Sequence, residues 1–163
     1  MKVLLALYPN TRGFGYACLE TCMKEKKLKL LDFGIINVRP AGNEKILKHV
    51  RKFAQYFKPE FVILRDYHKP TNRGRRIRDL IGCINQIAEQ HQLSIHRYTR
   101  EQVRYVFEQY GAKTKYEIAQ KLIEAFPELA SRAPKIRKPW EDEDYHMGVF
   151  DAIALATTHL YLS

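Results

Sequence analysis

The sequence has few cysteines, no long apolar run and a shortage of acidic residues. Its three cysteines, Cys18, Cys22 and Cys83, are odd in number and lack the paired spacing of a zinc site. We therefore expect them to be small buried apolar side chains, with neither a disulfide nor a metal. No segment reaches the roughly 18 continuous apolar residues of a membrane span, and the first apolar run stops at Tyr8 and Pro9, too early for a secretory signal. These absences predict a cytosolic (cytoplasmic) protein with no membrane partner.

The charge balance of the chain is strongly basic. Lys and Arg number 28 against 18 Asp and Glu, which gives a formal net charge of +10 and a pI of about 9.6. Such a balance favours polyanionic partners, nucleic acid in particular. The sequence has no glycine-rich phosphate loop, no His-Glu-x-x-His motif and no nucleophile elbow, so enzyme classes built on those motifs are not supported. The length of 163 residues is that of one ordinary domain, and we predict a single domain over 1–163.

Five apolar runs predict the strands of a sheet. Runs at 2–8, 14–22 and 28–38 are joined by short turns, which is typical of an antiparallel meander. The run at 61–64 contains no polar residue and predicts a strand buried on both faces. The run at 93–98 predicts a fifth strand.

Helical patterns alternate with the later strands. Apolar residues recur every three or four positions over 43–57, 73–91 and 149–162. Capping boxes at Thr99-x-x-Gln102 and Thr114-x-x-Glu117 predict two further helices, which end near Gly111 and Pro127, and the aperiodic residues 131–145 predict a surface loop. Strands reached through helical crossovers indicate an α/β fold. We expect a mixed five-stranded sheet, an antiparallel three-strand meander plus parallel strands, with helices on both faces.

Four stretches follow one another in a fixed order along nearly the whole chain. They are Tyr8-Pro9-Asn10-Thr11-Arg12-x-x-Gly15-Tyr16, Phe57-Lys58-Pro59-Glu60-Phe61-Val62-Ile63-Leu64-Arg65, Tyr98-Thr99-Arg100-Glu101-Gln102-Val103-Arg104 with the helix after it, and Asp151-Ala152-Ile153-Ala154-Leu155-Ala156-Thr157-Thr158-His159. In order and spacing they resemble the RuvC-type Holliday-junction resolvases of the RNase H-like superfamily. The resemblance implies an RNase H-like fold, a homodimer, branched DNA as partner and a place in DNA recombination and repair.

The resemblance also implies a nuclease centre in which four acidic or metal-binding side chains hold two Mg²⁺ ions about 4 Å apart. These four positions fall on Tyr8, Arg65, Gly148 and Asp151, so only Asp151 is retained as a metal ligand. A guanidinium about 5 Å from a divalent ion would repel it by on the order of several kcal/mol at an effective dielectric near 20. We therefore predict an inactive centre without a cofactor, in which Tyr8 and Arg65 form a seat for a phosphate.

A rearranged metal site is the alternative at this stage. Asp66 adjoins Arg65, and Asp144 precedes Asp151 by seven residues, which is two helical turns on the same face. Together with His146 these carboxylates are candidates for a rebuilt catalytic site. Such a site would make the protein an active Mg²⁺- or Mn²⁺-dependent endonuclease of the crossover-junction type.

Basic side chains supply the second functional signal. Those expected to bind nucleic acid are Arg65, Lys69, Arg73, Arg75, Arg76, Arg78, Lys113 and Lys115. Neutralising several phosphates would give binding that is largely independent of sequence and that weakens steeply with salt.

The leading interpretation is a RuvC-like protein that binds branched or structured DNA, with an inactive nuclease centre. Two alternatives stay open. One is an active structure-selective endonuclease with rearranged carboxylates, and the other is a non-enzymatic scaffold whose basic face meets an acidic protein.

Overall fold

The computed structural model describes residues 1–10, 13–22, 24–38, 42–66, 74–135 and 146–163. Its elements in chain order are β1 (Lys2–Pro9), β2 (Gly13–Cys22), β3 (Lys27–Asn37), α1 (Asn43–Phe57), β4 (Phe61–Arg65), α2 (Gly74–Gln90), β5 (Ser94–Tyr98), α3 (Arg100–Glu108), α4 (Lys115–Ala125), the 3₁₀ helix Pro127–Arg132 and α5 (Met147–Leu162). The five strands form one sheet in the order β3-β2-β1-β4-β5. The predicted strands and helices are thus present, with ends within a few residues of the expected ones.

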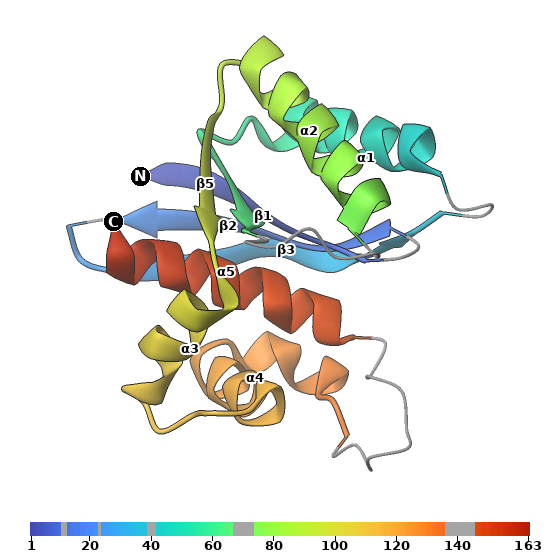
Figure 1. Cartoon of the computed structure of the whole chain (residues 1–163). Helices are drawn as coiled ribbons and strands as arrows, with labels where there is room; N and C mark the ends of the chain where they lie inside the picture. The colour runs from blue at the N-terminus through green and yellow to red at the C-terminus, as the bar shows by residue number, and fades with distance from the viewer. Residues whose placement is uncertain (11–12, 23, 39–41, 67–73, 136–145) are drawn as a thin grey trace.

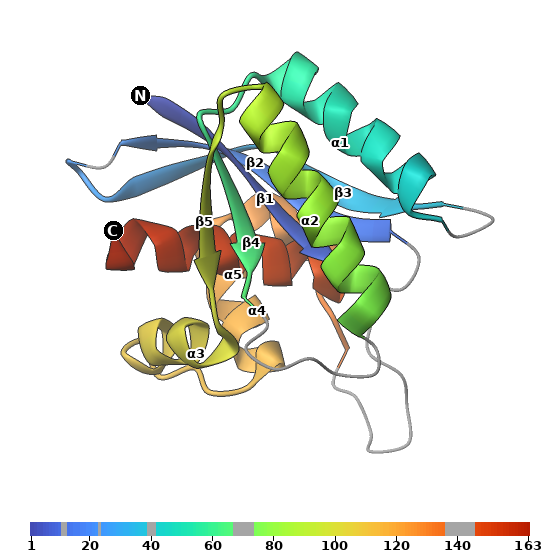
Figure 2. The same cartoon turned by 45° about the horizontal axis from the view of Figure 1, so that its top comes forward.

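The sheet is mixed, as predicted (Figure 2). β1, β2 and β3 pair antiparallel as a meander, whereas β4 runs parallel to β1 and β5 runs parallel to β4. Parallel neighbours need long crossovers, and the connections that carry α1 and α2 supply them. The carboxyl ends of β1, β4 and β5 consequently meet at one edge of the sheet.

Helices cover both faces of the sheet, which confirms the predicted layers (Figure 1). α1 and α2 pack on one face, and α5 crosses the other with α3 and α4 beyond it. Each layer has its own core because β4 alternates between them: Val62 and Leu64 join the cluster under α1 and α2, and Ile63 joins the one under α5. The expectation of a strand buried on both faces is confirmed.

Both predicted capping boxes are present. The Thr99 hydroxyl accepts from the amide of Gln102 at 3.2 Å, and the Thr114 hydroxyl accepts from the amide of Glu117 at 3.1 Å. The side chains of Gln102 and Glu117 accept in return from the cap amides. These caps fix where α3 and α4 begin and therefore where their first side chains lie.

Two boundaries differ from the sequence prediction. α5 begins at Met147, two residues before the expected start at Val149. The segment Pro127–Arg132 forms a 3₁₀ helix, so the predicted loop at 131–145 begins two residues later, and its part from 136 onward lies outside the described residues. Proline at the first helical position and a fully buried Leu129 favour this extra turn.

The cysteines form no disulfide. Cys18 is buried, as predicted, and burial raises the pKa of its thiol to about 12, whereas Cys22 and Cys83 are only half-buried. Among the described residues, every helix is too short or too polar to cross a membrane.

Candidate functional site

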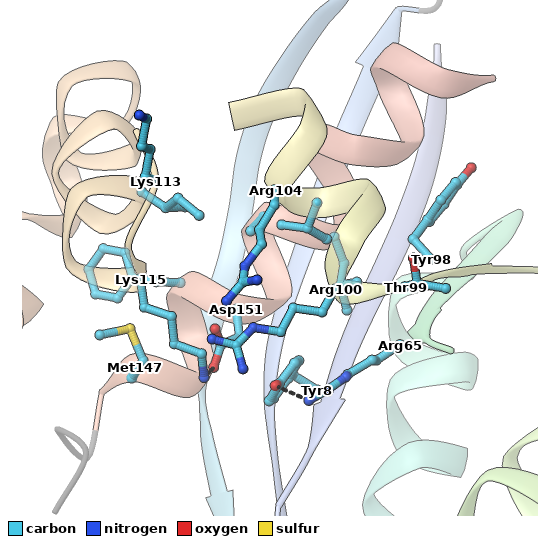
Figure 3. Close-up of a pocket in the computed structure, with 15 residues that line it drawn as sticks. Tyr8, Arg65, Tyr98, Thr99, Arg100, Arg104, Lys113, Lys115, Met147 and Asp151 are labelled. Carbon is cyan, nitrogen blue, oxygen red and sulfur yellow. Dashed lines mark hydrogen bonds and ion pairs between the residues drawn. The ribbon is translucent and has the colours of Figure 1, made fainter. Parts of the chain in front are cut away.

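A basic cavity lies at the sheet edge where β1, β4 and β5 end, between the sheet and helices α3, α4 and α5 (Figure 3). Its volume is about 60 Å³, which is space for several water molecules or a small anionic group. Among the described residues, its cationic lining comprises Arg65, Arg100, Arg104, Lys113 and Lys115. Asp151 is the one carboxylate in that lining.

Tyr8 and Arg65 meet on the floor of this cavity. A guanidinium nitrogen of Arg65 donates to the Tyr8 hydroxyl at 2.8 Å, and the guanidinium carbon lies 5.9 Å from the centre of the Tyr8 ring. Burial and then the charge of Asp151 raise the pKa of Tyr8, against the opposite effect of Lys115 and Arg65. The hydroxyl therefore keeps its proton, and it can donate that proton to an anionic oxygen while it accepts from Arg65.

Lys115 and Asp151 form an ion pair on the opposite wall. The Lys115 ammonium lies 3.4 Å from an Asp151 carboxylate oxygen and 5.6 Å from the centre of the Tyr8 ring. The Asp151 side chain is 13% exposed, so the pair is only partly solvated. Asp151, the one position at which the resemblance implies a retained metal ligand, is therefore paired with a cation of the protein itself.

The helix caps bring in the remaining cations. Arg100 opens α3 directly after the Thr99 cap, and Arg104 follows one turn later on the same face. Figure 3 shows both side chains extending toward Asp151, whereas Lys113 points away from it. The five cationic residues of the lining outnumber its one carboxylate, and this excess of positive charge favours an anion in the cavity.

A close backbone contact surrounds Gly148, where the resemblance implies a third metal ligand. A Cβ on Gly15 would lie 2.3 Å from the carbonyl carbon and oxygen of Gly148, and a Cβ on Gly148 would lie 3.1 Å from Ile35 Cδ1. α5 thus rests directly on β2, and the direction in which a side chain at 148 would leave the backbone is filled by Ile35 and Gly15. A side chain at Gly148 would therefore require the Ile35 side chain to shift by a few tenths of an ångström.

The pleat of β4 separates Asp66 from this cavity. The amide of Asp66 donates to the Tyr98 carbonyl at 2.8 Å, so the parallel ladder continues through Asp66. Successive side chains of a strand alternate between faces, and Asp66 lines a groove against α2 on the other face of the sheet. The structure does not bring Asp66 together with Asp151.

The other residues of the rearranged site are not gathered in the cavity either. His146 precedes α5 and does not line the cavity, while Asp144 lies outside the described residues. In the part of the chain that the structure describes, no group of three or more His, Cys, Asp or Glu side chains could hold a metal ion. Two divalent ions, which require several oxygen ligands each, do not fit the described lining of one carboxylate and five cations.

The expected basic segment divides into three parts. Arg75 and Arg78 are exposed on α2, where phosphate can reach them. Arg76 is partly structural because its Nε donates to Asn43 Oδ1 at 3.4 Å and its carbonyl accepts from Asn43 Nδ2 at 3.2 Å. Lys69 and Arg73 lie outside the described residues.

Sequence reasoning missed Arg100 and Arg104 as site residues. The signal was available, since a helix that starts after the Thr99 cap places positions 100 and 104 on one face. What the sequence did not supply was the direction of that face, which depends on how α3 packs against α5.

Comparison with known proteins identifies the fold. The sequence matches no protein-family model and no curated protein sequence. Thermus thermophilus RuvC in complex with a Holliday junction substrate superposes with a TM-score of 0.75 at 18% identity, over 99% of this chain and 94% of that chain. The chain has the RuvC fold. This confirms the predicted RNase H-like architecture.

Two further resolvase structures share the RuvC fold. The yeast mitochondrial Holliday junction resolvase gives a TM-score of 0.67 at 12% identity, over 96% of this chain and 77% of that chain. The fowlpox virus resolvase in complex with Holliday junction DNA gives a TM-score of 0.53 at 10% identity, over 99% of both chains. These matches span almost the whole length of the present chain.

Proposed function

We propose that this protein binds branched DNA through its phosphate backbone, and that its basic cavity holds a phosphate group where resolvases of the resembling family hold metal ions. The observation that carries the proposal is the pair of contacts at the cavity, Arg65 to Tyr8 and Lys115 to Asp151. The first contact joins a tyrosine hydroxyl and a guanidinium at two positions where the resemblance implies metal-binding carboxylates. The second neutralises the one carboxylate that is left.

The cavity suits a phosphate in charge, size and donor geometry. Arg65, Arg100 and Arg104 carry planar guanidiniums, which bind two phosphate oxygens at once, and Lys115 adds a point charge. The Tyr8 hydroxyl, which keeps its proton, adds a neutral donor. A space of about 60 Å³ can admit a phosphate group.

Branched DNA is the favoured form of the ligand because two of the structures with this fold are complexes with Holliday junctions, those of Thermus thermophilus RuvC and the fowlpox virus resolvase. The exposed Arg75 and Arg78 of α2 extend the basic surface beyond the cavity. Contacts of this kind bind the backbone of any sequence. A homodimer, as the family resemblance implies, would present two such surfaces to the arms of one junction.

A junction-binding assay with and without divalent ions tests the proposal. The parent protein, Lys115→Ala and Asp151→Asn are titrated against a labelled four-way junction and a linear duplex, in EDTA, in Mg²⁺ and in Mn²⁺. We expect binding in EDTA that weakens with salt, weaker binding by Lys115→Ala and no cleavage in either metal. Cleavage by the parent but not by Asp151→Asn would establish the active endonuclease instead. The absence of binding at low salt would favour the protein scaffold.

A further inference from the structure

An open groove lies between helix α1 and the edge strand β3. Its described lining comprises Asp32 of β3 and Lys52, Phe53, Gln55, Tyr56 and Phe57 of α1. Its volume is about 650 Å³, which is enough to receive large side chains. Asp32 pairs with Cys18, and Cys18 belongs to the core under α1 and α2, so the groove lies on the sheet face opposite to the basic cavity.

Aromatic rings form the floor of this groove. The centre of the Tyr16 ring lies 4.5 Å from that of Phe53, and the Phe53 ring lies 5.5 Å from that of Phe57. A Cβ on Gly34 would lie 3.0 Å from a carbon of the Tyr16 ring, so the ring lies across β3 where glycine leaves room for it. The Tyr56 side chain beside this floor is 80% exposed. A partner side chain placed here would cover apolar surface that water now reaches.

The outer edge of β3 offers backbone hydrogen-bonding groups. Among the described residues, this strand of 11 residues pairs with β2 alone. On the other side of such a strand, alternate residues direct N–H and C=O groups outward, where an added strand can pair with them. A bulge between Cys18 and Leu19 leaves Leu31 without a partner in the register. Residues 33–37 beyond the bulge pair regularly with β2, so this stretch presents a regular outer edge.

Exposed cations surround the groove. The exposed charged side chains of α1 are Lys45, Lys48, Arg51 and Lys52, with Glu44 as the acid among them. Lys52 lines the groove, and Lys29 is exposed on the same face of β3 as Asp32, because their partners Glu20 and Cys18 are two residues apart in β2. Neither Lys52 nor Lys29 forms an ion pair within the part of the chain that the structure describes. This charge favours an acidic partner.

The carboxylate of Asp32 is already bonded within the chain. Its Oδ1 accepts from the amide of Phe33 at 2.9 Å, and its Oδ2 accepts from the Tyr16 hydroxyl at 3.3 Å. Two donors of the protein itself therefore stabilise this negative charge. The lysines are the charged groups left for the side chains of a partner.

We propose that an extended, acidic segment of a partner protein adds to β3 as an additional strand and places one apolar side chain in the groove. A peptide backbone pairs with both the N–H and the C=O groups of an edge strand, whereas a DNA backbone carries acceptors but no donors. A second copy of this chain would bring its own net charge of +10 to this basic surface, so charge opposes that occupant. The groove and the basic cavity lie on different faces, so one molecule can bind the peptide and DNA together.

A synthetic peptide tests the proposal. The probe has about nine residues, with Glu, Phe and Glu at alternate central positions so that they share one face, and Thr elsewhere. It is titrated into ¹⁵N-labelled protein while the backbone amide shifts are followed. We expect a Kd of about 10–100 μM, with the largest shifts at residues 33–37 and at Tyr56.

Two N-methylated forms of the peptide test strand pairing itself. Each form carries methyl groups on alternate backbone amides, one form on the even and the other on the odd positions. An added strand pairs through one of its edges, so we expect one form to bind at least about tenfold more weakly and the other within about threefold of the unmodified peptide.

Variants of α1 test the groove. Lys52→Glu should weaken peptide binding by about tenfold, and Tyr56→Ala by about fivefold, since both remove contacts of exposed side chains. Arg51→Glu makes the same charge change at the preceding exposed position, outside the groove lining, and should weaken binding by less than about threefold. The thermal melts of all three should match the parent.

Several outcomes would overturn the inference. They are equal binding by both methylated forms, no shifts in β3 at about 1 mM peptide, and an effect of Arg51→Glu as large as that of Lys52→Glu. Shifts of β3 that depend on protein concentration alone would assign the edge to a second copy, and shifts caused by duplex DNA would assign it to nucleic acid. Junction affinity is measured beside each variant at about 150 mM salt. Junction binding that persists while the peptide fails would leave the proposed function standing.

Discussion

The ammonium of Lys115 in α4 lies 3.4 Å from the carboxylate of Asp151 in α5, although 36 residues separate them in the chain. The capping box at Thr114 makes Lys115 the first residue of α4, and this start of the helix places the lysine at the cavity. Asp151 is the one position at which the resemblance implies a retained metal ligand, and its carboxylate is paired with the Lys115 ammonium. The same relationship makes Asp151 the residue whose removal should leave the cavity more basic.

The variant Asp151→Asn is therefore expected to bind the four-way junction more tightly, by about two- to fivefold at about 50 mM salt. The reason is that the amide removes a negative charge from the cavity and releases Lys115 to a phosphate. Anisotropy titrations of the junction measure this directly. Asp79→Asn, an exposed change of the same charge on α2, should have a smaller effect. Weaker binding by Asp151→Asn would contradict the phosphate seat.

The variant Arg104→Ala should weaken junction binding by about three- to tenfold and reduce the slope of log affinity against log salt by about one. Each cation that contacts a phosphate releases roughly one counterion from the DNA, so its loss appears in the slope as well as in the affinity. Titrations between about 50 and 200 mM salt measure both quantities. Lys48→Ala, an exposed change on α1 away from the cavity, is the matched control. Equal slopes for Arg104→Ala and the parent would remove Arg104 from the interface.

The surroundings of Gly15 and Gly82 predict opposite effects on stability when each glycine is replaced by alanine. Gly15→Ala places a Cβ against the Gly148 carbonyl and should lower the free energy of unfolding by about 2–3 kcal/mol. Gly82→Ala places a Cβ in open space on α2 and should raise that free energy by about 0.5–1 kcal/mol. Urea unfolding of both variants measures the difference. A Gly15→Ala protein as stable as the parent would mean that β2 and α5 are not in contact.

Acid should destabilise the fold through His159. Burial, and then the charge of His96, lower the pKa of His159 to about 4, from an ordinary value of 6.5. The unfolded chain therefore binds a proton at a higher pH than the folded one does, and stability falls as the pH drops from about 6.5 to about 4. This group should cost about 2 kcal/mol between pH 7.5 and pH 5.

The variant His159→Asn isolates this contribution to stability. The His159 ring contacts Tyr98, whose hydroxyl lies 2.7 Å from Nδ1, and an asparagine oxygen can take the place of that nitrogen. Urea unfolding at the two pH values should show a smaller loss of stability for His159→Asn than for the parent. The same loss in both proteins would assign the acid sensitivity to other groups.

The sequence predicted the topology because local signals agreed with one another. Apolar alternation, the capping boxes at Thr99 and Thr114 and the crossover lengths all indicate one mixed sheet, and the structure has it. The side of the sheet on which Asp66 lies could not be predicted in this way. β4 is apolar on both faces, so its pattern does not distinguish a residue that faces α5 from one that faces α2.

The details of the cavity depended on packing between distant segments. The close contacts at Gly148 involve Gly15 of β2 and Ile35 of β3, both more than 100 residues earlier in the chain, and no local pattern reports them. The inward direction of Arg100 and Arg104 depends on how α3 packs against α5. The sequence resemblance placed Tyr8 and Arg65 at positions where metal ligands were expected, but the hydrogen bond between them was not readable from the sequence.

Direct measurement of Mn²⁺ binding tests the central claim that the cavity holds a phosphate in place of metal ions. Calorimetric titration of Mn²⁺ into the parent protein and into Asp151→Asn, with and without a four-way junction, distinguishes a phosphate-binding cavity from a metal site. The account predicts no stoichiometric Mn²⁺ binding in either protein and the same junction affinity in Mn²⁺ and in EDTA. Two Mn²⁺ ions bound per chain in the parent and lost in Asp151→Asn would contradict it.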